Sequence, residues 1–155
     1  MPVRMSKVEF ARATGTRKPR KAAKPPALVT PASSLVLTVT LPVVVVSEMN
    51  RRDHWAVVRR RTTGHKDSVF AAFLEYAFPK WIQTARFAVT LTRIGGKHMD
   101  RDNLAGSFKG VQDGVALALC IDDGDPNVQW SYAQVGASTG PQGIEIRIEA
   151  TEAQR

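Results

Sequence analysis

Cysteine is nearly absent from this chain of 155 residues, and its apolar runs are short. Cys120 is the one cysteine, so a disulfide within the chain is excluded and a reducing cytoplasm is the expected compartment. Because it follows Leu117 and Leu119, Cys120 is expected to be a small core residue rather than a nucleophile. The longest apolar stretch, residues 35–46, contains two threonines and Pro42 and is too short to span a bilayer. No membrane partner and no signal peptide are therefore expected.

Acidic residues are scarce in the first 34 residues, which hold eight Lys or Arg and only Glu9. This segment carries a charge of +7, whereas residues 35–155 carry +1 of the net charge of +8. It is rich in Ala, Pro and Ser and has little to bury. Residues 1–34 are therefore expected to be a disordered basic tail, suited to a polyanion such as nucleic acid or an acidic membrane surface. Residues 35–155 are expected to form one folded domain.

Strand patterns recur along the folded part, with apolar residues at every second position. They predict strands at 35–41, 87–92, 128–132 and 144–148. The run Val43–Val46 could resume the first strand after Pro42. Residues 138–143 are expected to form a hairpin loop between the last two strands.

Helix patterns lie between these strands. One helix is expected to end before Pro79, and it begins either at Asp67 or Ser68 or already near Trp55. A second is expected over 103–119, where Gly106, Gly110 and Gly114 recur every four residues and predict a closely packed second backbone. The fold class is thus α/β (mixed α+β), with a mixed sheet of about four strands and two main helices in the order β-α-β-α-β-β.

Two acidic clusters flank the second helix. Asp100 and Asp102 form the first, and Asp122, Asp123 and Asp125 form the second. Carboxylates at i and i+2 of an extended segment leave the chain on one face. Concentrated carboxylates must be protonated or neutralised by metal, and oxygen ligands suit magnesium or manganese. Because bridging metals activate water and stabilise a leaving oxygen, the clusters indicate a metal-dependent phosphodiesterase.

A purely structural interpretation of the same acids stays open. Asp102 or Asn103 is a good helix N-cap, and Asp123-Gly-Asp-Pro126 is ordinary turn chemistry. A straight helix of about 17 residues would also hold the two clusters about 25 Å apart. They share a metal only if the next strand runs back toward the first cluster or the helix is shorter.

Asp100-Arg-Asp102-Asn103-Leu104, then Lys109 and Asp113, then Ile121-Asp122-Asp123 resemble the signature of the RusA-like Holliday junction resolvases. The resemblance covers roughly residues 35–150. These are small homodimeric endodeoxyribonucleases common in phages and prophages. The resemblance implies hydrolysis of four-way junctions or other branched DNA by paired nicks, in DNA recombination and repair.

The resemblance also implies roles for individual residues. Asp100, Asp102 and Asp123 would be the catalytic carboxylates that bind Mg²⁺, or alternatively Mn²⁺, with Asp122 as an auxiliary acid. Lys109 would be the helical lysine that contacts the scissile phosphate. The family's lysine commonly falls where this chain has Gly106, so Lys109 lies about one turn further along a similar helix face.

Basic residues near both clusters are expected to contact DNA phosphates without reading sequence. They are Arg51, Arg52, Arg59, Arg60, Arg61, Lys66, Lys97 and Arg101. Trp55 is expected to be buried against the neighbouring helix, with stacking on a base as the alternative. His98, two residues before Asp100, is a further candidate for water activation.

Two other functions stay open. A non-catalytic basic DNA-binding protein of a phage or prophage would use the acids only as caps and turns, and would bind DNA in a salt-dependent way without nicking it. An RNA- or ribosome-associated basic protein would prefer structured RNA.

Overall fold

The computed structural model describes residues 33–136 and 139–152. Its elements follow in the order β1 (Ser34–Leu41), α2 (Trp55–Phe73), the 3-10 helix η1 (Lys80–Thr84), β2 (Ala85–Ile94), α3 (Arg101–Ser107), α4 (Lys109–Leu119), β3 (Val128–Val135) and β4 (Gly143–Glu152). The expected N-terminal tail lies outside the described residues, apart from Ser33 and Ser34. No helix in the described part of the chain is long and apolar enough to cross a membrane.

The four strands form one mixed sheet in the order β1-β4-β2-β3. β4 pairs antiparallel with both β1 and β2, and β2 pairs parallel with β3. The predicted mixed α+β class is therefore confirmed. The predicted hairpin between the last two strands is wrong, because β4 inserts between β1 and β2 and does not neighbour β3. Residues 43–46 form no strand, although Val45 is buried.

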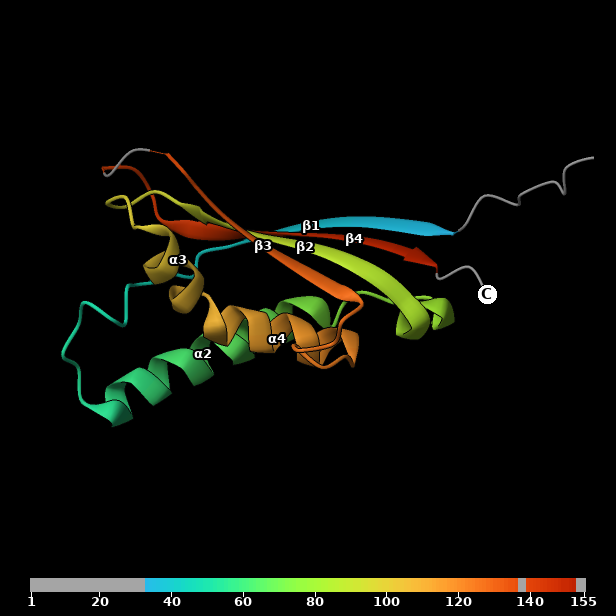
Figure 1. Ribbon diagram of the computed structural model, residues 1–155, viewed down its shortest axis with the longest axis horizontal. Helices are drawn as coiled ribbons and strands as arrows, with labels where there is room; N and C mark the ends of the chain where they lie inside the picture. Colours follow the sequence, from blue (N-terminus) through green and yellow to red (C-terminus); the bar gives the residue numbers. More distant parts are fainter. Residues whose placement is uncertain (1–32, 137–138, 153–155) are drawn as a thin grey trace, which may run out of the picture. The chain divides into compact units, whose positions relative to one another are not determined.

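One face of the sheet is covered by the helices (Figure 1). The alternating patterns of the sequence put apolar side chains on that face, and Val89, Leu91, Ile146 and Ile148 are fully buried. Burial of such side chains from two strands and two helices is the main driving force of folding. The core therefore lies between the sheet and the pair α2 and α4.

The first helix begins at Trp55, the earlier of the two expected starts. His54 caps it: its Nδ1 accepts a hydrogen bond from the Ala56 amide at 3.3 Å. Asp67 and Ser68 therefore lie inside α2 and are not caps. The helix ends at Phe73, and Pro79 instead precedes η1.

The second predicted helix is divided into α3 and α4 at Phe108. Its glycine face packs against α2 as predicted at two positions. A Cβ at Gly110 would lie 2.5 Å from the Thr62 carbonyl oxygen, and one at Gly114 would lie 2.8 Å from that of Lys66. At Gly106 nothing lies within 4 Å, so the prediction is wrong there. The glycines of α4 thus let two helix backbones approach closely.

Candidate functional site

The first acidic cluster begins α3. Asp100 is its N-cap, and its carboxylate accepts hydrogen bonds from the Asn103 backbone amide at 2.9 Å and side-chain amide at 2.5 Å. These bonds hold the pKa of Asp100 below its ordinary value. Asp102 lies in the first turn of the helix and is exposed. The expectation of two carboxylates leaving an extended segment on one face is therefore wrong, because Asp102 is already helical.

Asn103 connects this cluster to the segment before α2. It is buried, and its Oδ1 accepts a hydrogen bond from the Ser47 hydroxyl at 2.7 Å. With its amide donating to Asp100, each end of the Asn103 side chain has a partner. Neither Asp102 nor Asn103 is the cap that the structural interpretation assigned; Asp100 takes that role.

The second acidic cluster lies in a turn that folds back after α4. Cys120 ends the helix in a left-handed conformation (φ 55°) and is exposed, so its predicted place in the core is wrong. The Ile121 amide then donates to the Ala116 carbonyl at 3.0 Å, which reverses the chain. Within the turn, Asp122 accepts from the Gly124 amide and Asp125 accepts from the Asn127 amide, both at 2.8 Å. These bonds are the turn chemistry expected of Asp.

Lys109 joins this turn to the start of α4. Its ammonium pairs with Asp113, one helical turn later, at 2.8 Å and with Asp123 from the returning turn. The hydrogen bonds to Asp113 and Asp123 raise the pKa of Lys109, and Lys109 in turn lowers the pKa of Asp123. The separation of about 25 Å expected for a straight helix does not apply to Asp123, because its carboxylate reaches back to the first residue of α4.

Side chains of β3 span the distance between the two clusters. Trp130 Nε1 donates to the Asp123 carbonyl at 2.9 Å. Four residues later, Gln134 bonds both backbone groups of Met99, donating to its carbonyl at 2.6 Å and accepting from its amide at 3.0 Å. Four residues of strand extend about 13 Å. The backbones of Asp123 and of Met99, which precedes Asp100, are thus anchored to two positions of β3. These positions lie about 13 Å apart, about half of the 25 Å expected between the two acidic clusters.

Tyr132, between those two positions, was not singled out by the sequence. Its hydroxyl donates to Gln112 Oε1 at 3.0 Å, and burial raises the pKa of its phenol. The charge of Lys109 lowers that pKa, whereas the charge of Asp123 raises it. Alternation with Trp130 marks Tyr132 as facing the helices, but only the fold brings it to Gln112 of α4.

An open groove of about 260 Å³ adjoins the ion pairs. Its walls come from α2, α4 and the turn, and its charged residues are Lys66, Asp113, Asp122 and Asp123. Of the predicted site residues, the structure therefore brings together Lys66, Lys109, Asp122 and Asp123. Asp100 and Asp102 stay at the start of α3.

A metal site was predicted from both clusters together. Among residues 33–136 and 139–152, no three His, Cys, Asp or Glu side chains are placed to hold one metal ion. Lys109 already supplies positive charge to Asp113 and Asp123. In this arrangement, Asp100, Asp102 and Asp123 do not form one coordination sphere.

The predicted DNA-contacting arginines divide into two groups. Arg61 is largely enclosed and pairs with Glu48 at 2.5 Å and with Asp53 at 2.6 Å, so its charge is used within the fold. Arg51 also reaches Asp53, at 2.9 Å. The remaining arginines and Lys97 are exposed: Arg52, Arg59, Arg60, Lys97 and Arg101.

Trp55 lies beside the exposed arginines of α2. Its side chain is 67% exposed, so the predicted burial is wrong. Together with Arg59 and Arg60 it lines a shallow groove of about 470 Å³ on the outer side of the helix. An exposed indole among guanidinium groups can stack on a flat ring while the cations bind phosphates.

Comparisons with known proteins leave the function open. No protein-family model matches the chain, and no curated protein matches it. Among solved structures, it is similar to a HypE–HypF complex, with 12% identity, a TM-score of 0.35 and coverage of 95% of this chain and 42% of that one.

It is also similar to hydrogenase maturation protein HypE, with 12% identity, a TM-score of 0.32 and coverage of 97% of this chain and 41% of that one. HypE in complex with ATP gives 13% identity, a TM-score of 0.33 and coverage of 94% and 38%. The chain thus spans about two fifths of the length of these structures.

Proposed function

We propose that this chain is a magnesium-dependent, RusA-like endodeoxyribonuclease that resolves four-way junctions or other branched DNA by paired phosphodiester hydrolysis. The observation that carries the proposal is the ion pair between Lys109 and Asp123. It joins the lysine at the start of α4 to an aspartate of the following turn, two residues that the motif separates by a whole helix. Such a contact is expected if both serve one site.

A basic surface beside this pair supports a DNA substrate. Arg59 and Lys66 are seven residues apart on α2, so they lie on the same side of the helix, about 10 Å apart along its axis. Lys66 also lines the acidic groove. If Arg59 and Lys66 each neutralise a phosphate, a DNA strand would run along this side of α2 toward Asp123 and Lys109. Trp55 would offer a surface on which a base can stack.

The chain's own contribution to hydrolysis is charge at the phosphate. A lysine ammonium is protonated at neutral pH, and the carboxylates of Asp113 and Asp123 raise the pKa of Lys109 further. A phosphate oxygen could replace one of its carboxylate partners, which would stabilise negative charge on the phosphate. The proposed metal ligands, Asp100, Asp102 and Asp123 with Asp122 as auxiliary, would have to approach one another to bind Mg²⁺ or Mn²⁺. When bound, the metal would supply an activated water and stabilise the leaving oxygen.

The proposal includes a homodimer acting in the cytoplasm of a bacterial or phage-infected cell. A four-way junction has two-fold symmetry, and a two-fold symmetric dimer would present one site to each of two opposed strands. Paired nicks then follow from matching symmetries.

The proposal is tested by incubating the full chain with a synthetic four-way junction in Mg²⁺ and in chelator, followed by product sizing. Symmetric nicks in Mg²⁺ alone are expected. Asp102→Asn should bind the junction without cutting it, since it removes a proposed ligand from an exposed position. Full cutting by Asp102→Asn would contradict the proposed site.

A second candidate function is non-catalytic DNA binding. It is favoured by the cap and turn hydrogen bonds that Asp100, Asp122 and Asp125 already make. This candidate predicts salt-dependent junction binding with no nicks in either Mg²⁺ or Mn²⁺.

A further inference from the structure

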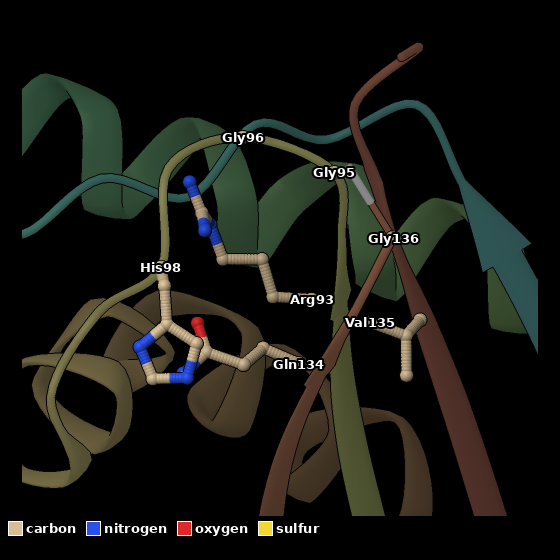
Figure 2. A pocket seen from close by; sticks show the side chains of 7 residues that line it. All are labelled: Arg93, Gly95, Gly96, His98, Gln134, Val135 and Gly136. Atoms are coloured by element: carbon tan, nitrogen blue, oxygen red, sulfur yellow. The ribbon is translucent and has the colours of Figure 1, made fainter. Parts of the chain in front are cut away.

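A small pocket lies at the other end of α3 from the lysine–aspartate pair, where β2 and β3 end. It has a volume of about 110 Å³, and its walls come from the Gly95-Gly96 loop, the ends of the two strands and His98 (Figure 2). Sites for drug-sized ligands occupy about 300–1,000 Å³. This pocket therefore suits a small ion or group rather than a base or a nucleoside.

Arg93 supplies the charge of the pocket. Its side chain is on the core-facing side of β2 and only 6% exposed. The guanidinium extends beneath the Gly95-Gly96 loop (Figure 2). A Cβ at Gly96 would lie 2.3 Å from Arg93 Nη2, so the loop backbone lies directly over the cation.

This buried cation has few partners within the described part of the chain. Its Nη1 donates to the Lys97 carbonyl at 2.7 Å. No carboxylate among the described residues lies within ion-pair distance of it. The one acid between Arg93 and Arg101 is Asp100, whose carboxylate is bound to Asn103. Among the described residues only Glu48 Oε2 is a fully buried side-chain polar atom without a partner, so the Arg93 N–H groups that lack one face the open pocket, where an anion would serve as their counter-ion.

The walls of the pocket are held in place before any ligand arrives. Gln134 is fixed by its two bonds to Met99, and its Nε2 also contacts His98 Nε2 at 2.9 Å. Gly95 and Gly96 have positive φ angles of 71° and 75°, which glycine adopts without strain. A rigid pocket loses little entropy when it binds a small ion.

We propose that this pocket binds a phosphate group through the Arg93 guanidinium. One Nη1 N–H is donated to the Lys97 carbonyl, and the other N–H groups of the planar guanidinium match the geometry of phosphate oxygens. The phosphate belongs either to a DNA backbone or to free inorganic phosphate. The proposal does not depend on nuclease activity, because binding of inorganic phosphate is measured without DNA.

The first test uses the unmodified full chain. Its melting temperature is measured in rising inorganic phosphate and in sodium chloride of equal ionic strength, and backbone amide chemical shifts are followed by NMR. A saturable rise specific to phosphate is expected, with the largest shifts at Gly95, Gly96 and Lys97. No phosphate-specific rise, or shifts centred elsewhere, would overturn the proposal whether or not any variant folds.

Two variants of Arg93 and one control variant assign the site to one residue. Arg93→Gln should weaken phosphate binding by about tenfold or more, whereas Arg93→Lys should retain part of it. Arg86→Gln removes an exposed arginine at the opposite end of β2 and should bind as the unmodified chain does. Equal phosphate affinity in folded Arg93→Gln and Arg86→Gln would overturn the proposal.

The source of the phosphate is decided by DNA titrations of Arg93→Gln and of the control variant Arg86→Gln. If the pocket holds a DNA phosphate, Arg93→Gln should lower junction affinity and reduce the slope of log affinity against log salt by about 1. If it holds free phosphate, junction binding should be unchanged while phosphate binding is lost. Both outcomes support the site, and junction cleavage is scored separately.

Discussion

Lys109 and Asp123 form an ion pair across the turn that follows α4, although the motif places them at opposite ends of that helix. The Lys109 ammonium also pairs with the Asp113 carboxylate, with 2.8 Å between Nζ and Oδ1. The pair exists because the chain reverses at Cys120 and Trp130 holds the backbone of Asp123 against β3. It makes Lys109 the residue that joins the start of α4 to the turn that carries Asp123.

Replacement of Lys109 tests whether this charge serves the reaction. Lys109→Gln should lower junction cleavage by about 10²–10³-fold, the range found when a group that stabilises developing negative charge is removed. Its melting temperature should change little, because Lys109 is 58% exposed and exposed ion pairs contribute less than about 1 kcal/mol. Lys80→Gln, an exposed lysine of η1, is the control. Equal cleavage rates in the two variants would remove Lys109 from the proposed site.

The close approach of α2 and α4 is tested by adding one methyl group. Gly110→Ala should destabilise the fold by about 1–3 kcal/mol, because the new Cβ meets a backbone oxygen that cannot move freely. Gly106→Ala meets no atom within 4 Å and should stabilise α3 by about 0.5–1 kcal/mol. Thermal unfolding of both variants gives the comparison. A Gly110→Ala melting temperature at or above the unmodified value would contradict the helix packing described.

The two groups of arginines should respond differently to substitution. Replacing both Arg59 and Arg60 with Gln should reduce the salt dependence of DNA binding by about two phosphate contacts without changing stability. Arg61→Gln should instead lower the melting temperature, since it leaves Glu48 and Asp53 without their shared cation. Salt titrations and thermal unfolding of each variant separate these effects. If only Arg61→Gln reduced the salt dependence of DNA binding, Arg61 and not Arg59 or Arg60 would be the DNA-contacting residue.

His65 should make the fold sensitive to mild acid. Burial is the largest cause that lowers the pKa of His65, and the charge of Arg61 adds to it against opposing effects of the Val44 carbonyl and Glu48. The unfolded chain, with an imidazole pKa of about 6.5, therefore binds more protons in this range than the folded chain does. Stability should be fully present above about pH 6.5 and fall as the pH drops through the lower, folded-state pKa.

The measurement for His65 is the melting temperature between about pH 7 and pH 5.5. The unmodified chain should lose stability more steeply than His65→Gln, whose side chain does not titrate. Parallel curves for the two proteins would show that another group governs this pH range.

The strands and helices were predictable because their signals are local. Alternation along residues 85–94 and 143–152 follows from one buried sheet face. The glycines of α4 indicate a closely packed neighbour because a larger side chain would collide with its backbone. Strand order was not predictable in the same way. The insertion of β4 between β1 and β2 depends on which edges remain open once the sheet forms, and no short segment encodes that choice.

The candidate site was predicted in its residue types and not in its geometry. The aspartates and Lys109 are visible as a motif, but the break at Phe108 and the reversal at Cys120 decide which of them meet. Neither position carries Gly or Pro, the residues that usually mark such changes of direction. The burial of Arg93 was not predictable from the sequence, because an arginine near the end of a strand pattern is ordinarily exposed. Here the Gly95-Gly96 loop encloses it.

The central claim is that Asp123 belongs to a nuclease site, and one cleavage assay tests it most directly. A labelled four-way junction is incubated in Mg²⁺ with the unmodified chain, with Asp123→Asn and with Asp125→Asn, a neighbouring turn residue whose replacement can keep its hydrogen bond to Asn127. We expect paired nicks from the unmodified chain and from Asp125→Asn, and intact junction bound by Asp123→Asn. Undiminished nicking by Asp123→Asn, or no nicking by any of the three proteins, would contradict the claim that Asp123 belongs to a nuclease site.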